Sequence, residues 1–274
     1  MRLAKHCIAL ALGASGLFAA DARAEPFSSF STTDRQSDDS LIGADIGIGF
    51  MDPVPFDDDQ SLRLDFHGQY LFDDRAGIYG MIPFSRLFSD TLDGSLALGN
   101  LEAGGYYIAP AGDLDLVLRG GLVLPTADGN LSARLTNGIA AGVRITDIAL
   151  AYHDTTWLRL GASPLLRSGD VFVRTDLGLD VPLRTDAGAD PLFRINVGGG
   201  VDLDPVSLLA ELALVLNADA APGIGDDNLI SGALTARFHG EQIQPGLSLV
   251  IPIDDSLRDV HDLGLVFSFQ VHLD

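Results

Sequence analysis

Apolar and polar residues alternate along most of this chain, in about twelve separate stretches. In the stretch 60–72, for example, Leu62 and Leu64 share one parity, whereas Arg63 and Asp65 share the other. Successive side chains of a β-strand point to opposite faces, so this rhythm predicts strands with one apolar and one polar face. The predicted strands are 41–50, 60–72, 76–84, 96–108, 114–124, 156–166, 171–183, 191–203, 206–218, 229–239, 243–253 and 262–273.

The connections between these stretches alternate between short and long. The short connections lie near 73–75, 109–113, 167–170, 204–205 and 239–242. The long connections lie near 51–59, 85–95, 125–155, 184–190, 219–228 and 254–261. Transmembrane β-barrels have this arrangement, because short turns join their strands on the periplasmic side and longer loops join them on the outer side. The sequence therefore predicts an all-β fold, a closed transmembrane antiparallel up-and-down β-barrel of about twelve strands, with both termini on the short-turn side.

The long connection 125–155 lacks the regular alternation. Its apolar residues Ile139, Val143, Ile148 and Leu150 are spread unevenly, which favours a short helix in the third outer loop. The alternative is a further hairpin, 139–145 with 148–153, which would raise the strand number to fourteen.

The first 24 residues have the features of a secretory signal peptide. Arg2 and Lys5 form a basic start, an apolar run of about 14 residues follows, and Ala22 and Ala24 fit the small-x-small cleavage pattern. The polar segment 25–40 is short of aliphatic residues, so we expect a flexible periplasmic lead-in. The barrel domain is then expected to span 41–274.

The composition agrees with a membrane barrel better than with a soluble domain. The chain carries a formal net charge of −21, yet 47% of its residues are hydrophobic and its mean hydropathy is +0.24. A barrel reconciles these values, because its apolar residues face lipid while its charges lie in the lumen and loops. A secreted β-sandwich, with its charges facing outward to water, is the soluble alternative. Nucleic acid is excluded as a partner, because so acidic a chain would repel it. The single cysteine, Cys7, lies in the predicted signal peptide, so the mature chain has no cysteine and no disulfide.

Aromatic residues lie near the predicted periplasmic ends of several strands, where an interfacial girdle is expected. They are Tyr70, Phe72, Tyr79, Tyr107 and Phe238.

The leader, the alternation and the loop pattern resemble those of bacterial outer-membrane β-barrel proteins of the transporter-like and porin-like kind. The stretch from Leu124 to Asp128, Leu-Pro-Thr-Ala-Asp, is similar to the LPTGD-like strand exits of transporter-like barrels associated with the uptake of aromatic compounds. The family's assembly signal, a terminal amphipathic strand that ends in an aromatic residue, is only partly met. Phe267 and Phe269 are present, but the chain ends in Leu273 and Asp274. The resemblance spans 41–274 and implies a location in the bacterial outer membrane.

Charged residues of both signs occupy the polar face of the predicted strands. The candidates for lining the lumen are Arg63, Asp65, His67, Glu102, Asp115, Arg119, Arg159, Arg174, Asp176, Asp180, Arg194, Asp202, Glu211 and Arg237. In a wide pore such charges line an aqueous path, whereas in a narrow barrel they pair across the lumen and fill it. Twelve strands lie between the packed small barrels and the open porins, so both outcomes stay open.

We assign no catalytic residue, no cofactor and no metal site. The His153-Asp154-Thr155 stretch comes nearest to a hydrolase motif, but it lies in a loop. The pairs Asp226-Asp227, Asp254-Asp255 and His261-Asp262 lie in outer loops, where a barrel hydrolase would place its catalytic groups, so an outer-membrane hydrolase stays open as a less favoured alternative. Asp57, Asp58 and Asp59 are weak candidates for binding Ca²⁺ or Mg²⁺, and solvated loop charge is the favoured interpretation.

The sequence thus favours a passive, porin-like channel for small solutes, with outer loop 125–155 as a candidate constriction. The alternative is a non-conducting structural or adhesion barrel that presents acidic outer loops. The expected partners are outer-membrane lipid, lipopolysaccharide and small solutes, and no oligomeric state is assigned.

Overall fold

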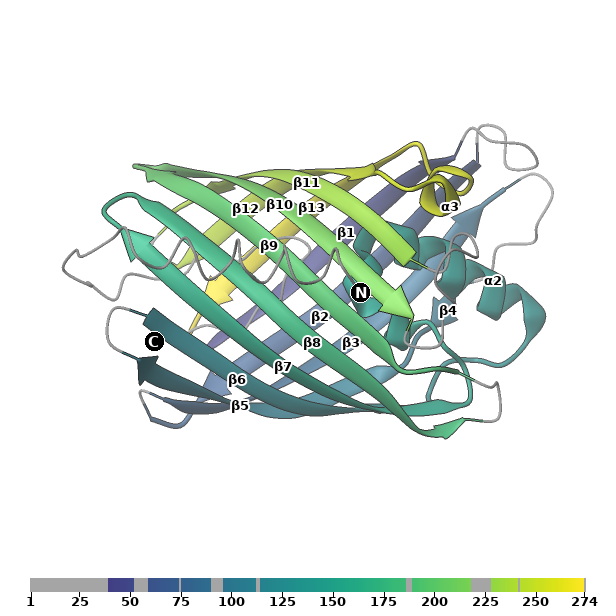
Figure 1. The fold of residues 1–274 in the computed structure, drawn as a ribbon. Helices are drawn as coiled ribbons and strands as arrows, with labels where there is room; N and C mark the ends of the chain where they lie inside the picture. The colour runs from purple at the N-terminus through teal and green to yellow at the C-terminus, as the bar shows by residue number, and fades with distance from the viewer. Residues whose placement is uncertain are drawn as a thin grey trace, which may run out of the picture.

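A single antiparallel sheet closes on itself, because β1 pairs with β2 on one side and with β13 on the other. The computed structural model describes residues 39–51, 59–73, 75–89, 96–111, 114–185, 189–217, 228–240 and 242–273. Within these residues, twelve strands form the barrel wall in chain order (Figure 1). They are β1 (Leu41–Met51), β2 (Asp59–Leu71), β3 (Ala76–Phe88), β5 (Leu101–Ala111), β6 (Leu114–Leu124), β7 (Thr155–Ser168), β8 (Val171–Thr185), β9 (Leu192–Leu203), β10 (Val206–Asn217), β11 (Asn228–Phe238), β12 (Ile243–Pro252) and β13 (Leu263–His272). The predicted closed, up-and-down, twelve-stranded barrel is confirmed.

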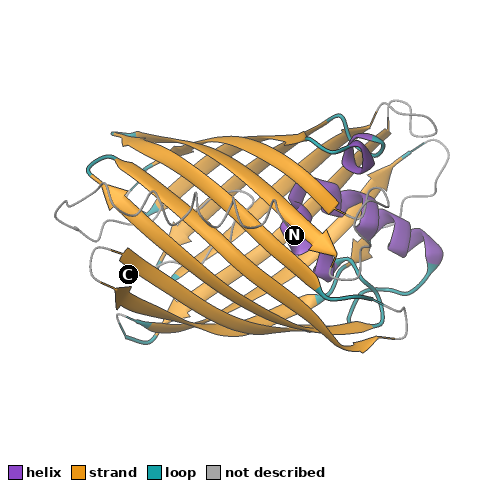
Figure 2. Cartoon of the chain, in the orientation of Figure 1, coloured by secondary structure: helices purple, strands orange, loops and turns teal. Residues whose placement is uncertain are grey.

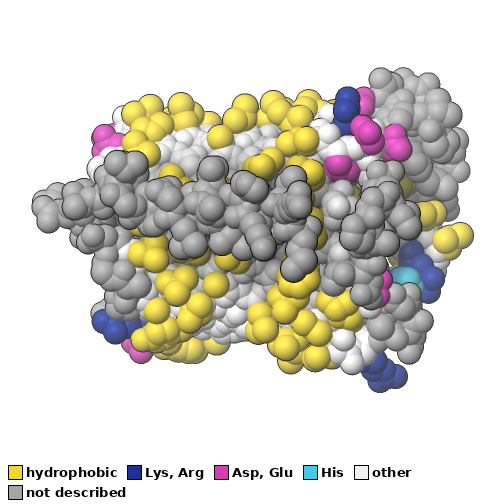
Figure 3. All heavy atoms as spheres, viewed as in Figure 1, with side chains coloured by type: hydrophobic (Ala, Val, Ile, Leu, Met, Phe, Trp, Pro, Cys, Tyr) yellow, Lys and Arg dark blue, Asp and Glu magenta, His cyan; other side chains and the backbone are white. Residues whose placement is uncertain are grey.

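The two parities of each strand meet different surroundings. On β10, Glu211 is buried inside the barrel, whereas the next residue, Leu212, is 49% exposed on the outer surface. The same holds on β1, where Asp45 is buried and Ile42 is 53% exposed. Figure 3 shows the result, with hydrophobic side chains over the middle of the barrel and most of the charged ones at its two ends. An outer surface of this kind matches the hydrocarbon core of a membrane and excludes the β-sandwich alternative.

A charge placed in this outer belt is expected to destabilise the barrel strongly. Leu212 lies in the middle of β10, so Leu212→Arg should lower the free energy of unfolding by about 2–4 kcal/mol, the cost of a cation at the bilayer midplane. Urea unfolding in lipid vesicles measures the change. Leu131→Arg is the matched control, because Leu131 is exposed at the start of a helix outside the wall. Equal effects of the two substitutions would contradict the lipid-facing assignment of Leu212.

The strand ends that the short connections join lie at one end of the barrel, and those that the long connections join lie at the other. The helical segments of the described residues lie at the end where the long connections begin and end (Figure 2): α2 (Leu131–Ala140), the 3-10 segment η2 (Ala141–Leu150) and α3 (Asp255–Arg258). The other end carries the strand ends that the short connections join, together with both ends of the described chain. There, Leu273 N donates to Ser40 O at 2.8 Å, and His272 Nδ1 lies 3.0 Å from Asp39 Oδ2. The predicted signal peptide, 1–24, lies outside the described residues.

The segment 131–150 is helical, so the fourteen-strand alternative is wrong. Asn130 caps α2 by accepting a hydrogen bond from Ala133 N. The predicted short helix is extended by η2, in which Arg144 leaves the helical conformation at φ −151° and ψ 74°. Among the described residues, no helix has both the length and the apolar composition needed to cross a bilayer.

The predicted strand 96–108 is interrupted. The structure forms a two-residue strand, β4 (Ala97–Leu98), which pairs with β3, and then β5. Between them, Asn100 turns toward the helical segment: its N donates to Leu150 O at 2.8 Å and its Nδ2 to Ala149 O at 3.3 Å. These bonds replace ladder bonds at this position, so the strand cannot run straight through.

The predicted aromatic girdle needs one correction. Tyr70, Phe72, Tyr107 and Phe238 are exposed on the outer surface, as predicted. Tyr79 points into the barrel, where its hydroxyl donates to Glu102 Oε1 at 2.8 Å. Both parities of β3 carry apolar residues, so the alternation there could not decide the face.

Candidate functional site: the lumen and the segment that fills it

All fourteen predicted lumen-lining residues have the inward parity of their strands. Eleven of them are buried: Arg63, Asp65, Glu102, Arg119, Arg159, Arg174, Asp176, Asp180, Arg194, Glu211 and Arg237. His67 is half-buried and its Nε2 lies 3.7 Å from Asp45 Oδ1. Asp115 and Asp202 are half-buried near the short-turn end of their strands. In this conformation many of these charges pair with charges on the same or nearby strands, as Arg63 does with Asp65 and Arg194 with Asp180. Their role in lining a solute path remains a prediction.

Arg159 joins three strands of the wall to the helical segment. From β7 its Nε lies 3.2 Å from Asp180 Oδ1 on β8, and its Nη1 donates to Glu102 on β5. Its Nη2 donates to Thr146 O of η2 at 2.8 Å. The guanidinium is 1% exposed, and its planar array of donors suits this multidentate arrangement.

Asp147 is the acidic counterpart of Arg159 on the helical segment. Its Oδ1 lies 3.3 Å from Arg159 Nη1, and its Oδ2 lies 3.7 Å from Arg63 Nη2. Its Oδ2 also accepts a hydrogen bond from Arg144 Nε, and Arg144 Nη1 in turn lies 3.8 Å from Asp45 Oδ2 on β1. Because Arg63 is on β2 and Arg159 on β7, one carboxylate of the segment joins separate parts of the wall.

A further set of ion pairs lies on the wall alone. Asp176 Oδ1 accepts from Ser163 Oγ at 2.6 Å, and its Oδ2 lies 3.5 Å from Arg119 Nη2. Arg194 Nη2 lies 3.0 Å from Asp180 Oδ1. Buried charges are costly unless they are paired in this way, so removal of one member leaves its partners with less counter-charge.

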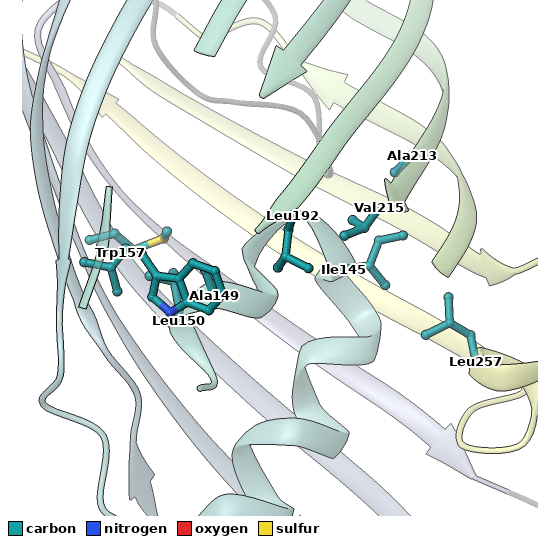
Figure 4. Packing of buried hydrophobic residues seen from close by; sticks show 10 residues of the cluster. Ile145, Ala149, Leu150, Trp157, Leu192, Ala213, Val215 and Leu257 are labelled. Atoms are coloured by element: carbon teal, nitrogen blue, oxygen red, sulfur yellow. The ribbon is translucent and has the colours of Figure 1, made fainter. Parts of the chain in front are cut away.

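The inner wall is apolar where the helical segment rests on it. Ile145, Ala149 and Leu150 of η2 pack against inward-facing residues of the strands, and Trp157 is fully buried among them (Figure 4). The wall residues of this cluster are Met81, Val123, Trp157, Leu192, Ala213 and Val215. The segment is therefore held by an apolar seat together with the ion pairs of Arg144 and Asp147.

Four members of this site were not among the predicted residues. Asp45 stands on the polar face of 41–50, so its alternation was a usable signal. Thr146, Arg144 and Asp147 lie in a long connection, and nothing in the local pattern indicates which side chains of a loop meet the wall.

A serine, a histidine and an aspartate meet at the short-turn end. Ser207 Oγ is bonded to both Asp202 and His239 Nε2, and His239 Nε2 lies 3.8 Å from Asp202 Oδ1. A catalytic triad needs the acid on the other ring nitrogen, so this cluster lacks the geometry for activating Ser207. Among the described residues, no group of three or more His, Cys, Asp or Glu is arranged to hold a metal ion. Asp57 and Asp58 lie outside the described residues, and Asp59 is buried on the inner face of β2.

No protein-family model matches the sequence, and no curated protein matches it. The fold is similar to that of the COG4313 outer membrane channel from Pseudomonas putida F1, with a TM-score of 0.62 and 14% identity over 90% of this chain and 100% of that one. It is also similar to the KdgM porin, with a TM-score of 0.51 and 9% identity over 85% of this chain and 99% of that one. The chain thus has the fold of bacterial outer-membrane barrels, and its apolar belt agrees with the predicted location in that membrane.

Proposed function

We propose that the protein is an outer-membrane channel for small polar solutes, and that segment 131–150 closes its lumen in the conformation described. One observation carries this proposal: the strands complete the barrel wall without any contribution from the segment. Every strand of the wall is paired with its two neighbours in the wall, and none of these ladders includes α2 or η2. The segment could therefore leave the lumen while the wall stays intact.

The lining of the lumen supports passage of polar solutes. Arg174 on β8, Glu211 on β10 and Arg237 on β11 face inward. Asp115 and Asp202 also face inward, near the short-turn end of their strands. Side chains of both signs can replace part of a solute's hydration and set up a transverse field, so diffusion needs no catalytic residue. The channels of similar fold described above also support this proposal.

The second candidate is a non-conducting structural barrel. The apolar seat, the cluster of wall residues around Trp157, favours the non-conducting barrel. If the segment left the lumen, Trp157 and its apolar neighbours would be exposed to water. Each large side chain buried in that seat contributes about 1.5–3 kcal/mol to keeping the segment in place.

Conductance separates the two candidates. In planar bilayers, we expect the full chain to give brief stepwise openings from a mostly closed state, since release of the segment competes with the seat and the ion pairs. Protein from the same preparation, unfolded before addition, is the control for leakage. The channel proposal fails if neither the full chain nor a folded chain lacking 131–150 gives any steps, and the non-conducting barrel then stands.

A further inference from the structure

We infer that the connection between β12 and β13, residues 253–262 with α3, is a latch that holds segment 131–150 in the lumen, with His261 as its wedge. The inference rests on the proposed function, because it describes what controls the closing segment. It assigns a role in gating to a loop that contributes no strand to the barrel wall.

The latch is fixed to the wall at both ends. At its start, Ile253 N donates to Ile230 O of β11 at 2.9 Å, and Asp254 also accepts from Ile230 N. At its end, Asp262 N donates to Phe50 O of β1 at 2.9 Å. Asp254 Oδ1 caps α3 by accepting from Leu257 N at 3.0 Å. The loop is therefore anchored on both sides of the β12–β13 pair and is bonded into a defined shape.

The inner side of the latch packs against both α2 and η2 of the segment. Leu257 is buried in the cluster that contains Ile145 of η2 (Figure 4). Val260 packs against the cluster that contains Ile139 of α2. The opposite side of α3 carries Asp255 and Arg258, which are exposed at the outer end of the barrel. One short loop thus links the outer surface to the closing segment.

His261 lies between the segment and the wall. Its Nε2 shares a hydrogen bond of 2.9 Å with Ser61 Oγ on β2, and its ring is 3% exposed. Two glycines make room for the ring: a Cβ at Gly142 of η2 would lie 2.6 Å from His261 Cε1, and a Cβ at Gly49 of β1 would also overlap it. Any side chain at Gly142 would therefore push the histidine or the segment out of place.

The imidazole fills this space as a neutral group. Burial lowers the pKa of His261 to about 4, because the charged form would lose its hydration there. Its Nδ1 is buried without a hydrogen-bond partner among the described residues. The ring therefore acts through its shape and through the one bond to Ser61, and not through an ion pair.

Cysteine labelling tests the latch independently of conductance. Ala149 is fully buried in η2, so in a Cys7→Ser background Ala149→Cys reports release of the segment through its rate of reaction with a hydrophilic maleimide in lipid vesicles. His261→Ala and Gly142→Ala should each raise this rate about tenfold or more, because both disturb the packing of the His261 ring against Gly142. Gly138→Ala is the matched control on α2, where a Cβ would meet nothing within 4 Å, and it should leave the rate unchanged.

Heat-modified gel mobility shows whether each variant has folded. If Gly142→Ala does not fold, His261→Gln replaces it, since it keeps a polar group near Ser61 but removes the ring from between the two glycines. Unchanged labelling in the folded His261 variants overturns the latch, even if deletion of 131–150 opens the channel. Faster labelling in a protein that never conducts supports the latch and overturns the channel function.

Discussion

Deleting residues 131–150 is expected to convert brief openings into long-lived ones and to raise the single-channel conductance several-fold. The deletion joins Asn130 to Ala151 through a short Gly-Ser linker. It removes the backbone of η2 together with Ile145 and Leu150, which pack against the inner wall. The wall should remain, because its ladders do not involve the segment. Planar-bilayer recordings measure the step size, and liposome swelling with neutral solutes of increasing size measures the width of the opened path.

The control for this deletion is a chain in which twenty Gly and Ser residues replace 131–150. That chain keeps the length of the connection but loses its apolar and ionic contacts, so it should conduct with frequent brief closures. Conductance steps of unchanged size in a folded deletion variant would mean that the segment does not narrow the path.

The wall of this barrel was predictable because strand alternation is a local property. The prediction for 114–124 coincides with β6, and 206–218 ends one residue beyond β10. Inward orientation of residues such as Arg159 and Asp180 followed from the same parity. The alternation failed on β3, where Ile78 and Tyr79 are both large and apolar and only the register against Glu102 decides which one points inward.

The sequence indicated outer loop 125–155 as a candidate constriction, but the contacts by which it occupies the lumen were not predictable in the same way. They join residues far apart in the chain, such as Asp147 with Arg63 and His261 with Gly142. The sequence showed that 125–155 was long and irregular, but the pairing of its charges with the wall is a tertiary property. The sequence drew attention to His261 only as a possible hydrolase residue, and it did not indicate that the ring packs against Gly49 and Gly142.

Replacing the Asp147 carboxylate is expected to shift the segment strongly toward release. In the seated segment, this carboxylate is shared by Arg63, Arg144 and Arg159. Asp147→Asn leaves these buried cations short of one counter-charge, which costs about 3 kcal/mol, the lower end of the range for breaking a buried pair. We take the lower end because Asp65, Asp45 and Glu102 still face the three arginines. Once the segment is released, residue 147 is hydrated, so the substitution costs little in that state.

A penalty of this size raises the ratio of released to seated segment about 100-fold. The open probability in bilayers and the labelling rate of Ala149→Cys should rise together. Asp154→Asn is the matched control in the same connection, because its ion pair with Arg134, at 3.8 Å, is between exposed side chains and contributes at most about 1 kcal/mol. A double-mutant cycle with Arg63→Gln then measures how much of the effect depends on the ion pair between Asp147 and Arg63 of the wall. If Asp147→Asn and Asp154→Asn behave alike, the ion pairs do not hold the segment, and the apolar seat and the latch must do so alone.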